Sequence, residues 1–249
     1  MIRILACWML TLTLAVGQEA SFEVASVKAN PGPLNRIFGY SASGPRVSYQ
    51  GYPPLGLVME AYNLEAYQVV LSRAIPQEES PYYDIVAKAP GEVALSRNEF
   101  RRMLQTLLAE RFGLKLHHEM KEMPVYALVV GKNGPKFKES AADAVFSGHI
   151  GVNGRNQSIT GVKYTMAELA RGIRQALGVD RPVVDRTGLT GQYDIKVEAT
   201  LESRYNRSPE FGDISVFTAV QEQLGLRLEP QKAMIDVVVI DRLEKPSSN

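Results

Sequence analysis

The sequence predicts an α+β fold made of two related strand-helix-strand-helix-strand units, each with two helices on a small mixed sheet. Three observations support this prediction. Apolar residues alternate between helical and strand spacing along the chain, and the tripeptide Tyr-Asp-Ile begins a strand twice. In both units the second helix ends in Gly-Leu, followed by a basic residue and another leucine. Because five elements recur in the same order, we expect an internal duplication.

Residues 1–20 have the layout of a secretory signal peptide. Arg3 precedes an apolar run over 4–16, and Ala15-Val16-Gly17 has the small-x-small pattern of a cleavage site. This run is shorter than the roughly 20 residues of a membrane span. We therefore expect an exported protein, periplasmic or extracellular, with no transmembrane segment in its mature part. An uncleaved anchor and lipidation at Cys7 are the alternatives.

The first α+β unit is expected over residues 21–140. An apolar stripe at helical spacing predicts a helix over 55–62, and a strand follows from Tyr83. A stronger stripe over 100–112 predicts a second helix that Gly113 ends with a left-handed cap. The apolar run over 125–130 then predicts a buried strand.

The second unit is expected over residues 157–249, after a connection over 141–156. The longer stretch 131–156 is rich in Gly, Asn, Lys and Ser, which is typical of a surface connection between the halves. The elements of the second unit repeat the order of the first unit. The predicted elements are a helix over 166–177 closed by Gly178, a short strand at 183–184, a strand over 193–197, a helix over 217–224 closed by Gly225, and a strand over 235–240. Residues 202–213 are expected to be an irregular loop, and 245–249 a frayed tail.

Composition excludes several classes of function. Lys and Arg total 28 against 27 Asp and Glu, and removal of residues 1–20, which carry Arg3 and Glu19, leaves 27 against 26. A nucleic-acid partner would require a basic excess, so none is expected. The only cysteine, Cys7, lies in the leader, which leaves no thiol for a nucleophile, a disulfide or a metal ligand. His117 and Glu119 could share a strand face and hold a weak metal, but solvent-facing residues are the favoured interpretation; we expect no metal and no cofactor.

The segment from Arg181 to Asp194, RPVVDRTGLTGQYD, has the densest pattern in the chain. Asp185 and Thr187 beside two glycines are suited to a tight turn, which an arginine paired with an aspartate would pin. Structural use is the favoured interpretation, and a rigid loop presented to a partner is the functional one. The weak candidates for binding are Arg181, Asp185, Arg186, Tyr193 and Asp194.

No catalytic constellation is evident, and no catalytic residue is assigned. One alternative is a hydrolase of a cell-wall or extracellular polymer that uses the carboxylates of Asp84, Asp185 or Asp194, which would then have to meet in one cleft. Another is a small-molecule sensor with a tyrosine-lined groove, although tyrosines equally suit a sheet edge. The tyrosines concerned are Tyr49, Tyr52, Tyr62, Tyr67, Tyr82 and Tyr83.

Four segments in order resemble a known family: FEVASVKAN at 22–30, and the stretches at 107–137, 181–198 and 219–249. Over these segments the chain is similar to an exported soil-bacterial domain of unknown function that occurs in many copies in acidobacterial genomes. The resemblance implies neither an established activity nor catalytic residues. Related domains are attached to sensor metallopeptidases of the antibiotic-sensing receptor type, whose membrane peptidase part this chain lacks.

A looser resemblance concerns the small N-terminal domains of secretins and TonB-dependent receptors. It rests on element order and on the Thr-Met-x-Glu-Leu-Ala helix start at 165–170. It implies contacts between proteins of the cell envelope. We therefore expect a non-catalytic binding or assembly module in the bacterial cell envelope, whose candidate partner is another envelope protein.

Overall fold

The computed structural model describes residues 20–30, 39–72, 81–200 and 214–246. The predicted signal peptide up to residue 19, the predicted irregular loop at 202–213 and the last three residues of the tail lie outside these ranges. The described part is mixed α and β, mostly sheet, with four α-helices and twelve strands, which confirms the predicted α+β class. No helix among the described residues is long and apolar enough to cross a bilayer.

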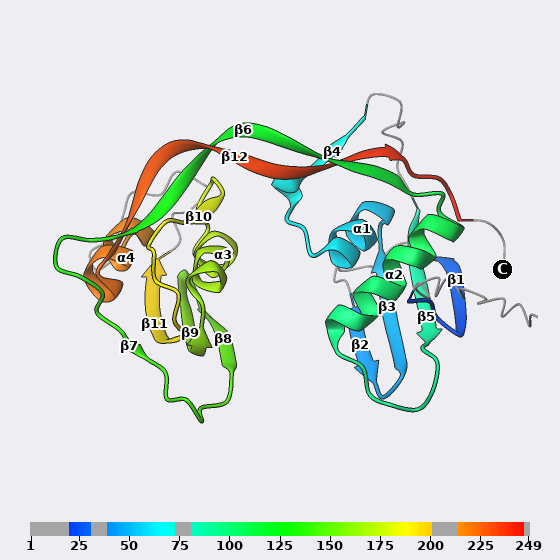
Figure 1. Ribbon diagram of the computed structural model, residues 1–249, viewed down its shortest axis with the longest axis horizontal. Helices are drawn as coiled ribbons and strands as arrows, with labels where there is room; N and C mark the ends of the chain where they lie inside the picture. Colours follow the sequence, from blue (N-terminus) through cyan, green and yellow to red (C-terminus); the bar gives the residue numbers. More distant parts are fainter. Residues whose placement is uncertain (1–19, 31–38, 73–80, 201–213, 247–249) are drawn as a thin grey trace, which may run out of the picture. The chain divides into compact units, whose positions relative to one another are not determined.

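The contacts divide the chain into two compact units (Figure 1). Unit 1 comprises residues 1–119 and 237–249, and unit 2 comprises 120–236. In chain order, the elements up to the middle of the chain are β1 (Val24–Asn30), β2 (Gly39–Ser43), β3 (Arg46–Tyr52), α1 (Pro54–Tyr62), the 3-10 turn η1 (Ala66–Gln68), β4 (Val69–Leu71), β5 (Tyr82–Lys88), α2 (Arg97–Arg111) and β6 (Lys115–Val130). They are followed by β7 (Lys138–Glu139), β8 (Ser147–Asn153), β9 (Asn156–Tyr164), α3 (Met166–Ala176), β10 (Val183–Asp185), β11 (Tyr193–Thr200), α4 (Val216–Leu224) and β12 (Leu226–Arg242).

Unit 1 packs α1 and α2 on a sheet of strand order β1-β5-β3-β2, in which every neighbouring pair is antiparallel (Figure 1). Tyr49 and Ile85 are opposite each other in register and both are fully buried. Phe100, Leu104 and Leu108 recur every fourth residue, so they line one side of α2 and enter the same core. The apolar stripe that predicted this helix therefore forms the face of α2 that packs against the core.

Unit 2 packs α3 and α4 on a second antiparallel sheet, of order β7-β11-β9-β8. Ile159 and Val197 are opposite each other in register and are fully buried. Leu169 and Ile173, four residues apart on α3, enter the same core. Thr165 caps α3 by accepting a hydrogen bond from the Glu168 N–H, which fixes where the helix begins.

A third sheet has the order β10-β6-β12-β4 and contains the two longest strands. In unit 1 the end of β12 is parallel to β4, with Val238 opposite Val69. In unit 2 the end of β6 is parallel to β10, with Tyr126 opposite Val183. Both long strands therefore contribute residues to both units.

Several boundaries differ from the predicted ones. The division falls at 119/120 and 236/237, not at 140 and 157, because the last strand of each predicted half pairs with a strand of the other half. The predicted connection at 141–156 contains the strand β8. The glycines of this strand had favoured a loop in the sequence analysis. The sheets of the two units are antiparallel rather than mixed, and the parallel pairs occur in the third sheet.

The predicted glycine caps are confirmed. Gly113, Gly178 and Gly225 follow α2, α3 and α4 and have φ values of 58°, 72° and 68°, in the left-handed region. The strand orders of the two antiparallel sheets also correspond, since adding six to each number of β1-β5-β3-β2 gives β7-β11-β9-β8. This correspondence agrees with a duplication, which stays a prediction.

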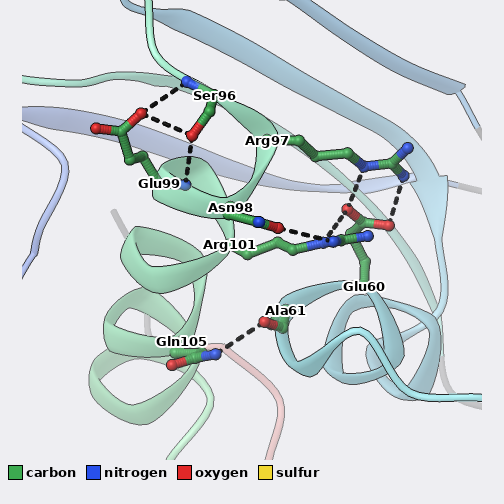
Figure 2. Close-up of polar contacts among 8 residues, drawn as sticks. All are labelled: Glu60, Ala61, Ser96, Arg97, Asn98, Glu99, Arg101 and Gln105. Carbon is green, nitrogen blue, oxygen red and sulfur yellow. Dashed lines mark hydrogen bonds and ion pairs between the residues drawn. The ribbon is translucent and has the colours of Figure 1, made fainter. Parts of the chain in front are cut away.

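A polar cluster joins α1 to α2 inside unit 1 (Figure 2). The Glu60 carboxylate, only 10% exposed, accepts hydrogen bonds of 2.8 and 2.7 Å from Arg97 and one of 3.2 Å from Arg101. Gln105 Nε2 donates to the Ala61 carbonyl at 2.8 Å, one turn along the same pair of helices. Because the Glu60 carboxylate on α1 accepts hydrogen bonds from two arginines on α2, it links the two helices.

We expect Glu60→Gln to destabilise unit 1 by about 1–2 kcal/mol, because it removes the counter-charge of two guanidinium groups whose side chains are 48% and 17% exposed. Urea unfolding followed by far-UV circular dichroism measures this. Glu92→Gln is the matched control: its carboxylate also pairs with a cation, Lys88, but is 83% exposed, so little change is expected. Equal unfolding midpoints for the two variants would contradict this role for Glu60.

Candidate functional site

The segment Arg181 to Asp194 forms the turn that its sequence predicts. Asp185 Oδ1 accepts hydrogen bonds from the Thr187 N–H at 2.9 Å and the Thr187 hydroxyl at 2.8 Å. Thr187 Oγ1 in turn accepts from the Leu189 N–H at 3.1 Å. The side chains of Asp185 and Thr187 are thus engaged within the turn itself.

Three other predicted binding candidates, Arg181, Arg186 and Tyr193, each contact different neighbours. The Arg181 guanidinium lies 5.2 Å from the ring centroid of Tyr126 and 3.6 Å from Asp180, not beside Asp185 or Asp194. The Arg186 N–H donates to the Leu128 carbonyl, which attaches the turn to β6. Tyr193 is 7% exposed, packs edge-on against Phe137 at 5.1 Å, and its hydroxyl accepts from the Gly191 N–H.

Asp194 is the predicted candidate that faces an open site. The Ser140 hydroxyl donates to it at 2.6 Å, and Lys138 Nζ lies 3.4 Å away. The Ser140 hydrogen bond holds the pKa of Asp194 below its usual range, and Lys138 lowers it further, so Asp194 is ionised at neutral pH. Ser140 Oγ also accepts from the Lys163 N–H, which fixes the hydroxyl in place.

Asp194 lines a cavity of about 400 Å³ within unit 2, which we call the basic cavity. Its walls come from the segment after β6, from β11 and from the end of α4. The lining residues are Lys136, Phe137, Lys138, Asp194, Lys196, Gln223 and Leu224. A second cavity of about 340 Å³ shares Lys136 and is also lined by Lys132 and Arg227. Cations thus predominate here, in a chain whose net charge is only +1.

Backbone contacts hold the walls of the basic cavity together. The Lys136 N–H donates to the Leu224 carbonyl at 2.9 Å, and Lys136 Nζ donates to the Glu222 carbonyl at 2.7 Å. A side chain at Gly225 would overlap the Gly134 carbonyl, so only glycine allows this close approach. On β11, Asp194 and Lys196 alternate with buried residues and therefore face outward together.

Sequence reasoning identified Asp194 and missed the lysines of the basic cavity. Lys136 and Lys138 lie in a segment that was interpreted as a connecting loop, and Lys196 belongs to a strand. The available signal was the spacing of Lys132, Lys136 and Lys138 beside two glycines. That signal is weak, because lysines are common on exposed loops.

A second feature of unit 2 is its outer strand, β8. Eleven large hydrophobic side chains are exposed in the described part of the chain, and four of them fall within 145–152, so apolar exposure is concentrated here. Ile150 and Val152 are 48% and 68% exposed, because β8 is the last strand of its sheet. Ile150 is opposite the fully buried Ile159, so it continues the apolar face that α3 covers.

An aromatic pair lies at the start of β8. The Phe146 and Tyr164 rings stack with centroids 5.8 Å apart and planes inclined by 10°. Tyr164 lies against the cross-strand pair Gly148 and Gly161, where a Cβ on either glycine would overlap its ring or hydroxyl. The glycines of β8 therefore accommodate an aromatic side chain, and the strand remains regular beside it.

The carboxylates of the hydrolase alternative do not meet within either unit. Asp84 lies in unit 1, where its Oδ1 accepts from Asn30 Nδ2 and the Gly51 N–H, both at 2.8 Å. Asp185 and Asp194 lie in unit 2, and only Asp194 lines the basic cavity. Among the described residues, each carboxylate is held by neighbours of its own unit.

The tyrosines of the sensor alternative are largely core residues. Tyr49, Tyr52 and Tyr83 are at most 8% exposed. The Tyr49 hydroxyl is buried and has no hydrogen-bond partner among the described residues, and burial raises its pKa above the usual range. Tyr62, Tyr67 and Tyr82 are half-buried. Tyr49, Tyr52 and Tyr83 thus supply apolar area to the core of unit 1.

One histidine, His117, forms an exposed pair with an aspartate. His117 Nδ1 lies 2.8 Å from Asp241 Oδ2, and both side chains are about half exposed. Within the described ranges, no group of three or more His, Asp or Glu side chains comes together as a metal site requires.

The comparisons with known proteins place the chain in one family. The family described as "Protein of unknown function (DUF3738)" matches residues 56–243, which is most of the chain. Neither a curated protein nor a solved structure matches the sequence. The match extends into both units. It includes the resembling segments at 107–137 and 181–198 and most of the one at 219–249, but not the one at 22–30. The chain therefore belongs to the DUF3738 family of proteins of unknown function.

Proposed function

We propose that the protein is a non-catalytic assembly module that associates through the free edge of β8. The observation that carries this proposal is a seven-residue edge strand without the features that block pairing in natural sheets. β8 has no Lys, Arg, Asp or Glu, no proline and no register shift against β9. Such an edge offers unpaired backbone N–H and C=O groups to a complementary strand.

The other outer strands are less suited to pairing. β1 also has seven residues but carries the charged Lys28. β2 is shorter, and its Tyr40 ring is covered by the Arg97 guanidinium at 4.4 Å from the centroid. The outer strands β4, β7 and β10 have only two or three residues each. Among these outer strands, β8 alone combines seven residues, no Lys, Arg, Asp or Glu, and exposed apolar side chains.

The occupant that fits this edge is β8 of a second copy of the chain. A two-fold axis at Ile150, the middle residue, makes the two strands antiparallel and sets Gly148 opposite Val152 of the other copy. The small residue thus faces the larger one, and no like charges oppose each other. Pairing joins the two four-stranded sheets into one and buries the apolar side chains of both copies.

We propose further that this assembly belongs to the cell envelope or the extracellular space. The support is the leader in the sequence, with Arg3 before the apolar run at 4–16. An envelope protein that offers a strand like β8 is the natural alternative partner, because an edge strand accepts any neutral, extended segment with alternating apolar residues.

Ile150→Lys is expected to convert a dimer of the mature protein into a monomer. A charged side chain in the middle of an edge strand opposes its own copy across the two-fold axis, and its desolvation is unfavourable. Size-exclusion chromatography with light scattering, over a wide range of protein concentrations, measures the change in mass.

Val93→Lys is the matched control for this experiment. It introduces the same charge at an exposed apolar residue, 74% exposed, in unit 1. The control variant should remain dimeric. A wild-type protein that is monomeric at every concentration, or equal dissociation of both variants, would refute self-assembly at β8.

The leader makes a separate prediction. When the full chain is expressed in a Gram-negative host, we expect the mature protein in the periplasm, shortened by about 20 residues in its intact mass. Leu12→Arg interrupts the apolar run, so this variant should stay in the cytoplasm at full length. Recovery of the unaltered chain from the cytoplasm at full length would contradict export.

A further inference from the structure

We propose that the basic cavity binds a phosphate monoester, independently of assembly at β8. The cavity is lined by three ammonium groups, from Lys136, Lys138 and Lys196, and by the single carboxylate of Asp194. Its lining therefore has a net charge of +2. A phosphate monoester carries a charge of about −1.5 to −2 at neutral pH, so it complements this lining.

The lysines have donor capacity to spare. Lys196 is exposed and forms no side-chain hydrogen bond or ion pair within the described residues. Lys138 lies 3.4 Å from Asp194, a long ion pair, and its side chain is 81% exposed. Lys136 donates one N–H to the Glu222 carbonyl and retains two. Each ammonium group can thus turn toward a phosphate oxygen without breaking the fold.

Asp194 is fixed in the wall of the cavity and competes only weakly for the lysines. Its Oδ1 accepts from the Ser140 hydroxyl at 2.6 Å, and its Oδ2 lies 3.4 Å from Lys138 Nζ. Gln223 forms part of the wall, because its amide exchanges two hydrogen bonds, of 2.9 and 2.8 Å, with the backbone of Glu198. The cavity therefore has fixed polar walls and movable cationic side chains.

The apolar lining of the cavity can contact the organic group of a phosphate monoester. Phe137 and Leu224 give the cavity an apolar side, and Phe137 is held in place by the edge-on contact with Tyr193. A volume of about 400 Å³ is in the range of sites for small organic molecules. A phosphate on an aromatic or sugar-sized group fits this pairing of cationic and apolar walls.

The adjoining cavity adds positive charge on one side. It is lined by Lys132 and Arg227 and shares Lys136 with the basic cavity. Arg227 pairs with Glu229 through one terminal nitrogen at 2.5 Å, while its Nε is buried and has no acceptor within the described residues. The positive potential therefore extends beyond the three lysines and favours an anion over a neutral ligand.

The test is calorimetric titration of the mature protein with phenyl phosphate at pH 8 and low ionic strength. At this pH the probe is a dianion, and low salt leaves the charges unscreened. We expect saturable binding that is at least tenfold weaker for benzenesulfonate, which has the same ring and a single charge. Inorganic phosphate should bind more weakly than phenyl phosphate, because it does not contact Phe137 and Leu224.

Two variants should change the affinity in opposite directions. Lys196→Gln removes an unpaired cation from the wall and should weaken phenyl phosphate binding about tenfold. Asp194→Asn removes the carboxylate but keeps an acceptor for Ser140, so binding should tighten. Lys115→Gln, the same charge change at an exposed lysine of unit 1, is the control and should bind as the wild type does.

Circular dichroism of each variant confirms that the fold is retained. Absence of saturable binding by the wild-type protein would overturn the proposal. Equal losses for Lys196→Gln and Lys115→Gln would also overturn it, because they indicate attraction to overall charge and not to this cavity. Loss of phosphate binding with an unaltered dimer refutes this site alone and leaves the β8 proposal intact.

Discussion

The fold depends on the exchange of two long strands. β6 and β12 have 16 and 17 residues, and each begins in one unit and ends in the other. The end of β12 places Val238 and Ile240 in the core of unit 1, next to β4. The end of β6 places Leu128 in the core of unit 2, next to β10. The core of unit 1 is therefore assembled from two separate stretches of sequence, whereas the core of unit 2 lies within one continuous stretch, 120–236.

This constraint explains the charged middles of the long strands. Where β6 and β12 leave one core and have not entered the next, their residues are mostly exposed. The charges pair across the strands within each unit: His117 with Asp241 in unit 1, and Glu122 with Lys232 in unit 2. Charged side chains on exposed strands discourage pairing with other chains. By contrast, β8 has no Lys, Arg, Asp or Glu, and this difference is why we propose β8 as the assembly edge.

Local features of the fold could be predicted from the sequence, and non-local ones could not. Apolar spacing gave the helices to within a few residues, and Gly113, Gly178 and Gly225 marked their ends because only the residues near a helix end determine its cap. Which strand pairs with which is decided by packing between segments a hundred residues apart, as in the pairing of Val69 with Val238. The contact-based units therefore have other boundaries than the predicted halves, although the helices and several of the strands were recognised. β8 was missed because Gly148 and Gly151 suit a loop equally well, and their role beside Tyr164 appears only when the sheet is formed.

The candidate site follows the same logic. The segment from Arg181 to Asp194 has a strong sequence pattern because turns require particular residues. The side chains of Asp185 and Thr187 form hydrogen bonds within this turn. Lys138 and Lys196 carry little local information, since nothing in the fold requires a lysine at either position. A charged side chain that the fold does not require can turn to contact a ligand. In this protein the functional candidates are therefore found where the structure leaves lysine side chains with donors to spare and a strand edge unpaired, and not where the sequence pattern is strongest.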